Sequence, residues 1–229
     1  MTQETGGFAA FNLNPNILAA VTATGYEEPS AIQQQSIPII MAGHDMIGQA
    51  QTGTGKTAAF ALPILHRIDP AKREPQALIL APTRELALQV ATAFETYSKQ
   101  MPGVTVVAVY GGAPMGPQLK AIRNGAQIVV ATPGRLCDHL RRDEKVLATV
   151  NHLVLDEADE MLKLGFMDDL EVIFKALPAT RQTVLFSATL PQSIRAIAER
   201  HLRDPQHVKI QTKTQTVTAI EQAHLLVHA

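Results

Sequence analysis

The residue types best able to do chemistry occur in two short clusters, and each cluster follows an apolar run. The first is the glycine-rich turn AQTGTGKT at 50–57. The second is a group of acids, Asp156, Glu157 and Asp159, which follows the apolar run at 153–155. Glycine-rich turns bind phosphate oxygens through backbone N–H groups, and carboxylates hold metal ions that face phosphates. Together the clusters indicate phosphate chemistry assisted by a metal ion.

The glycine-rich turn has the residues that a phosphate chain requires. Its glycines let backbone N–H groups converge, and a helix start adds a favourable dipole. Lys56 can reach the β and γ phosphates, and the Thr57 hydroxyl can ligate magnesium. The turn departs from the general P-loop pattern at Ala50, where glycine is usual. An ordinary strand–helix turn is the alternative, but Gly-Lys-Thr between a predicted strand and a predicted helix favours a nucleotide site.

Three interpretations compete for the acidic cluster. Carboxylates favour helix N-termini, carboxylate pairs serve as acid and base in glycosidases, and carboxylates hold metal ions. Because a P-loop needs a second strand whose terminal acid holds magnesium, we assign Asp156 to the metal and Glu157 to the attacking water. The glycosidase interpretation leaves the P-loop without a role. The capping interpretation stays open, since Asp159 could also favour the following helix.

An alternation of strands and helices must position these clusters. Near-continuous apolar runs predict strands covered on both faces, and the amphipathic stretches between them predict helices. This alternation predicts an α/β fold with a mostly parallel sheet and helices on both faces, whose ligands bind outside the carboxyl ends of the strands. The predicted strands are 45–50, 76–81, 104–110, 126–131, 152–156 and 182–188, and the predicted helices are 55–68, 83–99, 114–124, 134–142, 157–163, 168–177 and 191–202.

Composition limits the remaining possibilities. The 229 residues suit one α/β domain, or one domain plus a fragment, and 46% hydrophobic residues suffice for a sizeable core. A net charge of −1 gives no bulk basic footprint, so any nucleic-acid contact must be local. The single cysteine, Cys137, is expected to pack in a helix and fits a reducing cytoplasm. No membrane-length apolar run occurs, so we expect a cytoplasmic protein without a membrane partner.

Asp156-Glu157-Ala158-Asp159 also spells the signature of the DEAD-box RNA helicases. Over roughly 8–210 the chain resembles that family, most closely its bacterial cold-shock branch. The matching segments, in order, are GYEEPSAIQ (25–33) with Phe8 upstream as the Q motif, AQTGTGKT as motif I with the family's usual alanine, PTRELA (82–87) as motif Ia, Gly111-Gly112 as the paired glycines, TPGR (132–135) as motif Ib, and SAT (187–189) as motif III. The resemblance implies a RecA-like P-loop domain that uses ATP and Mg²⁺ and acts on RNA.

The resemblance also implies roles for single residues. Tyr26 would stack on adenine, and Gln33 would read the adenine edge through its amide; on the residues alone, Gln33 fits a solvated helix face. Ser187 and Thr189 would couple the ATP site to the RNA-bound state, and a plain strand end is the alternative. The nucleotide would further contact Thr52, Gly53, Thr54, Gly55, Lys56 and Thr57, with Lys56, Asp156 and Glu157 catalytic and Thr57 and Asp156 holding Mg²⁺.

RNA contacts would come from the segments that resemble motifs Ia and Ib and the paired glycines. Such residues offer cations, hydroxyls and close backbone approach to phosphates, which implies little sequence specificity. The alternative is that both arginines pair with local acids. The implied RNA-binding residues are Thr83, Arg84, Gly112, Thr132, Gly134 and Arg135.

The chain is expected to divide into three parts. Residues 1–7 lack a core-forming pattern and should fray, 8–210 form the N-terminal RecA-like domain, and 211–229 form a linker and the first strand of an absent second RecA-like domain. That second domain would supply the arginine fingers, so this lobe, expected to be monomeric, should bind nucleotide but hydrolyse it poorly. Two alternatives stay open: a stand-alone nucleotide- or RNA-binding module, and a DNA helicase, which only the resemblance disfavours.

Overall fold

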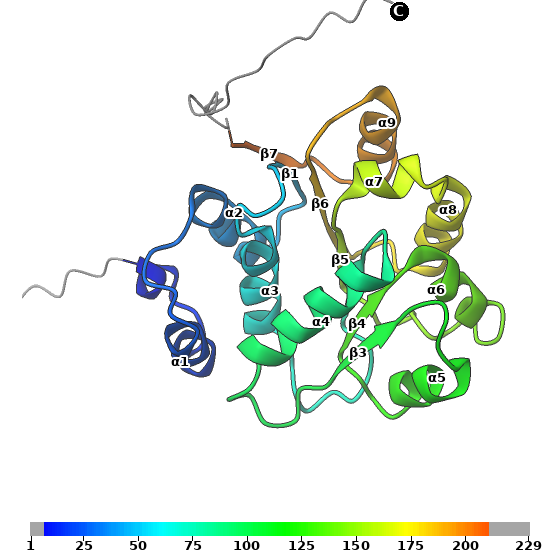
Figure 1. Ribbon diagram of the computed structural model, residues 1–229, viewed down its shortest axis with the longest axis horizontal. Coiled ribbons are helices and arrows are strands. Elements are labelled where there is room, and N and C mark those ends of the chain that lie inside the picture. The colour runs from blue at the N-terminus through cyan, green and yellow to red at the C-terminus, as the bar shows by residue number, and fades with distance from the viewer. Residues whose placement is uncertain (1–6, 211–229) are drawn as a thin grey trace, which may run out of the picture.

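A seven-stranded parallel sheet forms the centre of the computed structural model, which describes residues 7–210 (Figure 1). The strand order is β3-β4-β2-β5-β6-β1-β7, and every pairing is parallel. All strands therefore end at one edge of the sheet, the carboxyl edge, and begin at the other, the amino edge. The strands are β1 (Met46–Gln49), β2 (Ala77–Leu80), β3 (Val106–Val109), β4 (Ile128–Ala131), β5 (His152–Leu155), β6 (Gln182–Ser187) and β7 (Gln206–Lys209).

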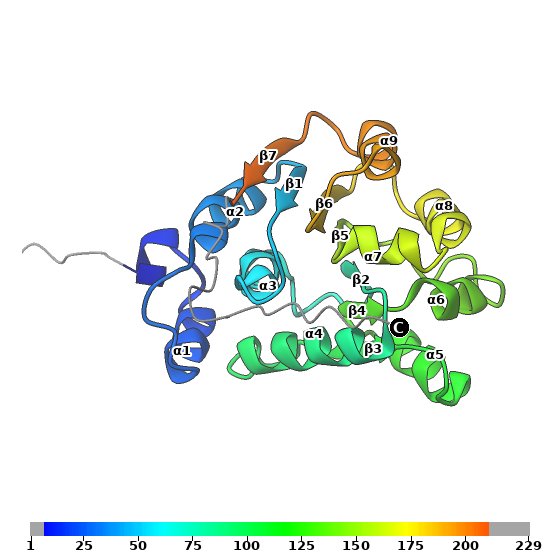
Figure 2. The same cartoon turned by 45° about the horizontal axis from the view of Figure 1, so that its top comes forward.

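Helices cover both faces of the sheet (Figures 1 and 2). One face carries α1 (Pro15–Ala23), α2 (Ala31–Met41), α3 (Lys56–Arg67) and α4 (Arg84–Tyr97), preceded by the 3₁₀-helix η1 (Gly7–Phe11). The other face carries α5 (Met115–Arg123), α6 (Pro133–Leu140), α7 (Ala158–Lys163), α8 (Met167–Ala176) and α9 (Gln192–His201). This arrangement confirms the predicted α/β class.

Two hydrophobic cores result, because neighbouring side chains of a strand point to opposite faces. In β5, Val154 joins the core under α1–α4, whereas Leu153 and Leu155 join the core under α5–α9. Full burial of an aliphatic side chain contributes about 1.5–3 kcal/mol, so a strand that is apolar at every position anchors both layers. Cys137 belongs to the second core, where its thiol donates to the Asp169 carbonyl at 3.5 Å and burial raises its pKa to about 12.

The sequence-based prediction missed four elements, η1, α1, α2 and β7, and misjudged β3. β7 escaped notice because only Val208 of its four residues is buried. α1 was not predicted, nor was α2, which has polar residues at its start and Pro38 in its interior. The expectation that every predicted strand is covered on both faces is wrong for β3, an edge strand with three partly buried residues.

The two predicted ends of the chain lie mostly outside the described residues. Gly7 was expected to fray with the N-terminus but begins η1, so that boundary is wrong by one residue. Residues 1–6 and 211–229, including the predicted linker and strand, lie outside the described residues. Within 7–210, no helix combines the length and apolar character needed to cross a membrane.

Candidate nucleotide-binding site

The predicted site residues meet at the carboxyl edge because of the strand order. β6 lies between β1 and β5 in the sheet. The glycine-rich turn follows β1, the acids follow β5 and the Ser-Ala-Thr segment follows β6. Three segments that are distant in the sequence thus share one edge, as expected for ligand sites in parallel sheets.

The glycine-rich turn has a backbone that favours glycine at two positions. Gly53 and Gly55 have φ angles of 82° and 92°, in the left-handed region that other residues adopt at a cost. Gly55 also has a packing constraint, since a Cβ there would lie 2.5 Å from the amide nitrogen of Gln33. Lys56 then opens α3, where backbone N–H groups without helical partners are available to an anion.

Lys56 and the acids form a buried charged cluster. The Lys56 amine lies 4.0 Å from Asp156 Oδ1 and 3.8 Å from Glu157 Oε1, and Lys56 and Asp156 are 6% and 2% exposed. Burial raises the pKa of Asp156 to about 6, with Lys56 opposing and Glu157 reinforcing the shift. Neither Lys56 Nζ nor Asp156 Oδ1 has a hydrogen-bond partner. Burying a charged group whose hydrogen bonds are not made is costly, so these atoms fit a bound phosphate and a divalent cation.

Glu157 has a strained backbone. It caps α7 with a φ of 53° and a ψ of 52°, a left-handed conformation that costs a non-glycine residue roughly 1–2 kcal/mol. Its carboxylate accepts a 3.1 Å hydrogen bond from the Thr52 hydroxyl, which ties the acidic segment to the glycine-rich turn. No local pattern in the sequence indicates this contact. Retained strain beside a charged cluster indicates a functional constraint.

Asp159 connects the acidic segment to the end of β6. Its carboxylate accepts hydrogen bonds from the Thr189 hydroxyl at 2.8 Å and the Thr189 N–H at 3.0 Å. Burial acts to raise the pKa of Asp159, but hydrogen bonds from Thr189, Ser187 and the backbone lower it overall. Asp159 also lies in the first turn of α7, where a carboxylate favours the helix N-terminus, so the capping interpretation stays open beside these hydrogen bonds. The Ser187 hydroxyl donates to the Thr189 carbonyl at 2.6 Å.

Gln33 does not lie on a solvated helix face, because it is only 5% exposed. Its amide nitrogen donates to the Gly55 carbonyl at 3.1 Å, and its oxygen accepts from the Ser30 N–H at 2.8 Å. Ser30, which was not singled out in the sequence, donates its hydroxyl to the Thr54 carbonyl at 2.8 Å. The 25–33 segment therefore holds the glycine-rich turn. The spacing of Ser30 and Gln33, typical of a helix start, was the available signal.

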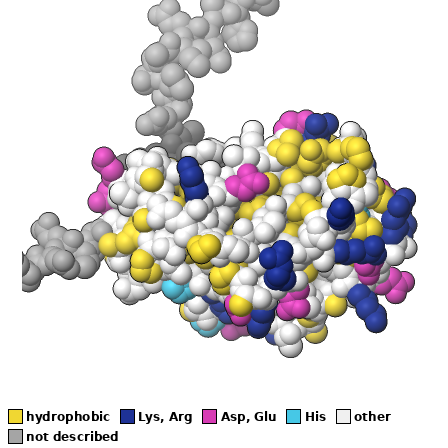
Figure 3. Space-filling model, turned by 90° about the horizontal axis from the view of Figure 1, so that it is seen from below, with side chains coloured by type: hydrophobic (Ala, Val, Ile, Leu, Met, Phe, Trp, Pro, Cys, Tyr) yellow, Lys and Arg dark blue, Asp and Glu magenta, His cyan; other side chains and the backbone are white. Residues whose placement is uncertain are grey.

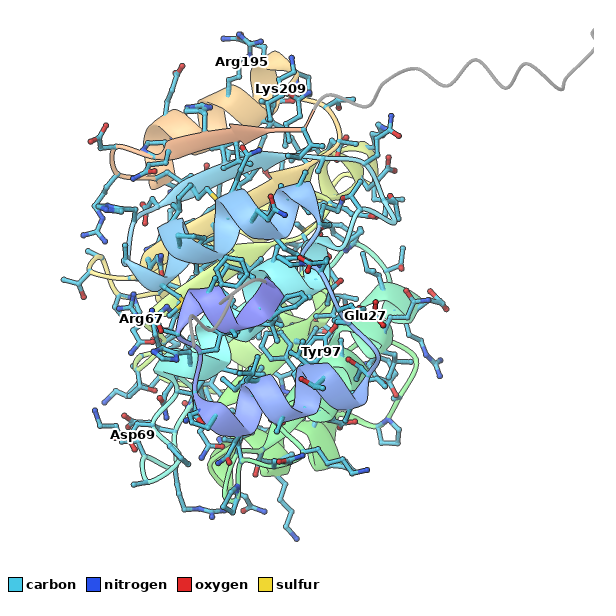
Figure 4. The ribbon with its side chains drawn as sticks, turned by 90° about the vertical axis from the view of Figure 1, so that its left-hand side faces the viewer. Glu27, Arg67, Asp69, Tyr97, Arg195 and Lys209 are labelled. Atoms are coloured by element: carbon cyan, nitrogen blue, oxygen red, sulfur yellow. The ribbon has the colours of Figure 1, made fainter. Side chains whose placement is uncertain are left out.

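Tyr26 lies between two other aromatic rings. It stacks on Phe8 with ring centres 6.0 Å apart, and its hydroxyl lies 3.3 Å from that of Tyr97 at the end of α4. Tyr26 is 42% exposed and lines a cavity of about 440 Å³ with Phe8 and Glu27 (Figure 4 labels Glu27 and Tyr97). The sequence did not indicate Tyr97, because it falls on the apolar face of its helix.

The two candidate RNA-binding arginines have different environments. Arg84 is exposed and lies 4.9 Å from the Tyr110 ring centre, without an acidic partner among residues 7–210. Arg135 donates to the Ala113 carbonyl at 2.7 Å and lies 3.8 Å from Asp138. Pairing with a local acid, the alternative interpretation, thus fits Arg135 and not Arg84.

The other candidate RNA contacts are polar groups at helix starts and a nearby glycine. Thr83 caps α4 by accepting from the Leu86 N–H, Thr132 precedes α6, and Gly134 lies in its first turn. Gly112 has a φ of 79° and lies beside the Arg84 guanidinium. On the face in Figure 3, basic side chains are interspersed with acidic and uncharged ones. Any RNA contact there would therefore rest on a few cations.

A further cavity lies apart from these residues. It measures about 740 Å³, and α9, β1 and β7 line it through residues such as Ile47, Ile194 and Val208. Figure 4 shows two rim residues, Arg195 and Lys209, together at the end of the molecule opposite Asp69. This cavity shares no lining residue with the candidate nucleotide-binding site.

Comparisons with known proteins agree with the geometry. The sequence model of the family described as "DEAD/DEAH box helicase" matches residues 30–197. Proteins named "ATP-dependent RNA helicase DeaD" are similar to the chain: that of Klebsiella pneumoniae is 54% identical and that of Escherichia coli K12 is 52% identical, each over 95% of this chain and 34% of the relative. The chain thus spans about a third of the length of these relatives.

A solved structure has the same fold. The crystal structure of a DEAD box protein from the hyperthermophile Methanococcus jannaschii superposes with a TM-score of 0.86 at 40% sequence identity. The match covers 90% of this chain and 56% of that one. The RecA-like class expected from the sequence is therefore confirmed.

Proposed function

Because the chain belongs to the DEAD/DEAH box helicase family, we propose that it is the ATP-binding lobe of an ATP-dependent RNA helicase that locally unwinds or remodels RNA duplexes. The observation that carries this proposal is the buried cluster of Lys56, Asp156 and Glu157, in which Lys56 Nζ and Asp156 Oδ1 make no hydrogen bond. The names of the similar proteins support the same activity.

Each group in the cluster has a proposed task. Backbone N–H groups of the glycine-rich turn and the Lys56 amine hold the β and γ phosphates. The Thr57 hydroxyl and Asp156 hold Mg²⁺, Asp156 directly or through water. When bound, Mg²⁺ supplies charge neutralisation at the phosphate oxygens. Glu157 orients or deprotonates the attacking water, and its tie to Thr52 positions it over the turn.

Adenine recognition is proposed for Tyr26 and Gln33. An amide has two donors and two acceptor lone pairs, and Gln33 uses one of each within the protein. It can therefore hold the glycine-rich turn and meet the adenine edge at the same time, while Tyr26 stacks on the base. Guanine reverses the donor and acceptor of that edge, so Gln33→Ala should reduce discrimination between ADP and GDP.

RNA binding is proposed for Thr83, Arg84, Gly112, Thr132, Gly134 and Arg135, through backbone contacts with little sequence specificity. Coupling between the sites is proposed for Ser187 and Thr189, and the Asp159–Thr189 hydrogen bonds support that role by joining motif III to the acidic segment. We further propose that 8–210 is one RecA-like domain of a cytoplasmic protein and that 211–229 leads into a second one. As a monomeric lobe, residues 1–229 would bind nucleotide but hydrolyse it slowly, since an arginine finger is worth roughly 10³–10⁵ in rate.

The proposal is tested by separating the two acids. Asp156→Asn should weaken nucleotide binding in the presence of Mg²⁺, because it removes charge beside the cation, and should change binding little in EDTA. Glu157→Gln should leave binding largely intact in both conditions. Titration with a fluorescent ADP analogue measures all four cases. Equal loss of binding in both variants would contradict the assigned roles.

A stand-alone binding module is the second candidate function. It is supported by the same phosphate-binding cluster and differs in having no hydrolysis. The comparison is ATP turnover, with and without single-stranded RNA, by residues 1–229 and by a chain extended through a second RecA-like domain. RNA-stimulated turnover by the extended chain would support the helicase proposal, and its absence would support the module.

A further inference from the structure

A second cavity lies at the amino edge, far from the candidate nucleotide site. It measures about 310 Å³ and lies where α8 and α9 end and β6 begins. These two helices are neighbours on one face of the sheet (Figures 1 and 2). The described residues that line the cavity include no acid, whereas five are basic: Lys175, Arg181, Arg200, His201 and Arg203. In a chain of net charge −1, this is a local concentration of positive charge.

Helix dipoles explain only part of this charge. Lys175 lies in the last turn of α8, and Arg200 and His201 lie in the last turn of α9, where cations are stabilised by the carbonyl ends. Glu171 pairs with Arg200 at 2.8 Å and with His201 at 3.3 Å. Arg181, however, lies outside both helices and has no acid within ion-pair distance among residues 7–210.

The guanidinium group of Arg203 is hydrogen-bonded to the backbone of Arg181. Arg203 donates through Nη2 to the carbonyls of Thr180 and Arg181, at 3.3 Å and 2.6 Å. Burial lowers the pKa of Arg181, Asp45 acts in the opposite direction, and Arg203 lowers it further. The positive charge of Arg203 thus acts on Arg181 against the effect of Asp45, and an anion in the cavity would offset this repulsion.

Arg181 is also incompletely hydrogen-bonded. It is 7% exposed, and Nη1 donates to the Pro178 carbonyl at 2.9 Å, but Nε has no partner. Among the described residues, only two other charged side chains have buried atoms without a partner, and both, Lys56 and Asp156, belong to the candidate nucleotide site. The remaining such atoms are neutral groups. Burying a charged group whose donor makes no hydrogen bond costs free energy, unless a ligand accepts that hydrogen bond.

We propose that this cavity binds a phosphate group, held by Arg181, Arg203 and Lys175. Guanidinium groups match phosphate geometry, and the lysine adds a point charge at the rim. The Phe174 ring is not available to a nucleobase, because His201 stacks on it at 3.8 Å and Arg181 lies 5.6 Å from its centre. The ligand is therefore recognised through its phosphate and not through a base.

The position of the cavity separates it from the nucleotide site. β6 begins beside the cavity at Gln182 and ends at Ser187 on the carboxyl edge. Five residue steps along a strand correspond to roughly 17 Å. The phosphate could belong to an RNA backbone that passes this edge or to a free phosphorylated compound, and the chemistry of recognition is the same in both cases.

The first test uses inorganic phosphate on the 229-residue chain saturated with ADP and Mg²⁺, so that the glycine-rich turn is occupied. The NMR chemical shifts of backbone amides around 180–182 and 200–203 should change as phosphate is added and should reach a plateau. The double variant Lys175→Gln, Arg203→Gln should bind phosphate roughly tenfold more weakly, the effect of losing about 1.4 kcal/mol of charge-assisted hydrogen bonding. The matched control Lys72→Gln, Lys99→Gln removes the same charge from exposed positions outside the cavity and should bind like the wild type.

The outcomes are distinct. No saturable shift near the cavity, or equal affinity in the double variant and the wild type, would overturn the proposal. The remainder of the NMR spectrum reports whether the double variant is folded. If it is not, the single variant Lys175→Gln, which removes an exposed side chain, provides the same comparison.

The second test distinguishes the two sources of the phosphate. Anisotropy of a labelled single-stranded RNA is measured across salt concentrations. If the RNA backbone occupies the cavity, the double variant should lose about 0.7 from the slope of log affinity against log salt for each lost contact, and the control should not. Equal slopes assign the cavity to a free phosphorylated compound. Absence of any RNA binding would contradict the proposed function, while the inorganic-phosphate result stands by itself.

Discussion

At the amino edge of the sheet, the buried amide of Gln182 has three hydrogen-bond partners, whereas at the carboxyl edge the buried amine of Lys56 has no hydrogen-bond partner. Gln182 donates to the carbonyls of Ile40 and His44, and its oxygen lies 3.1 Å from a ring nitrogen of His152. Asp45 accepts from the N–H groups of Thr183 and Arg203 on the same edge.

The difference distinguishes buried groups that stabilise the fold from buried groups that bind a ligand. A buried polar group with all its partners stabilises one arrangement of the chain, and removing it leaves those partners unsatisfied. A buried charged group without partners destabilises the free protein, so its retention indicates a ligand that completes it. Arg181 is the member of the amino edge that follows the second pattern, which is why the phosphate proposal rests on it.

The largest expected effect concerns hydrolysis at the carboxyl edge. In a chain extended through a second RecA-like domain, Glu157→Gln should lower RNA-stimulated ATP turnover by about 10²–10⁴-fold, the usual contribution of a general base. Stability should not fall, because the strain at Glu157 lies in the backbone and is retained. A steady-state ATPase assay measures the change. Turnover within a factor of three of the wild type would remove Glu157 from the mechanism.

Next in size is nucleotide affinity. Lys56→Ala should weaken ADP binding by roughly a hundredfold, because one charge-assisted contact to phosphate is worth up to about 3 kcal/mol. The free energy of unfolding should change by less than about 1 kcal/mol, since Lys56 Nζ makes no hydrogen bond in the free protein. Calorimetry and urea unfolding measure the two quantities, with Lys72→Ala as the control. Large destabilisation without loss of affinity would reverse the contrast between the edges.

Gln182→Ala should show the opposite pattern. It deprives the Ile40 and His44 carbonyls and the His152 ring of a partner, and unsatisfied buried groups cost about 1–3 kcal/mol each, so we expect a total near 3 kcal/mol. Nucleotide affinity should be unchanged, because the residue lies at the far edge. Urea unfolding and ADP titration on one preparation give both values. A loss of stability below about 0.5 kcal/mol would show that these hydrogen bonds are not structural.

Acid should lower the stability of the protein through the protonation of His152, which also lies at the amino edge. Burial and the charge of Arg67 lower the pKa of His152 to about 4 from 6.5, against the opposing hydrogen bond to Gln182. The unfolded chain then binds the proton more readily, so stability is complete above about pH 6.5 and falls as the pH drops towards 4. The shift corresponds to roughly 3 kcal/mol. His152→Asn should flatten this part of the curve of unfolding free energy against pH, and an unchanged slope would contradict the assignment.

The smallest expected effect tests whether α4 supports the adenine site. Tyr97→Phe removes only the hydroxyl that faces Tyr26, so ADP affinity should fall by about two- to fivefold, in line with one neutral hydrogen bond. Affinity for inorganic tripolyphosphate, which has no base, should not change. The matched control is Tyr110→Phe. Equal weakening for both ligands would indicate a general structural effect and not base positioning.

The sequence allowed the main elements and the motif positions to be predicted, because both are local. The run at β5 is apolar at each central position, and the glycine-rich turn places its functional residues side by side in the chain. β7 could not be predicted in the same way, since its place in the sheet depends on pairing with β1 and not on its own composition.

Contacts between distant segments could not be predicted from the sequence for the same reason. The Thr52–Glu157 and Tyr26–Tyr97 hydrogen bonds join residues 105 and 71 positions apart, and no local pattern encodes them. Gln33 was placed on a solvated face by its polar neighbours, whereas tertiary packing against the glycine-rich turn buries it.

The buried position of Cys137 has a practical consequence for spectroscopy. It is the single thiol of the chain, it lies in the core, and its pKa of about 12 leaves almost no thiolate near neutral pH. Maleimide dyes and thiol-reactive spin labels should therefore not react with the native protein. A cysteine introduced at an exposed position near either edge would then carry the label alone, so distances across the sheet could be followed during nucleotide and phosphate binding without first removing a native thiol.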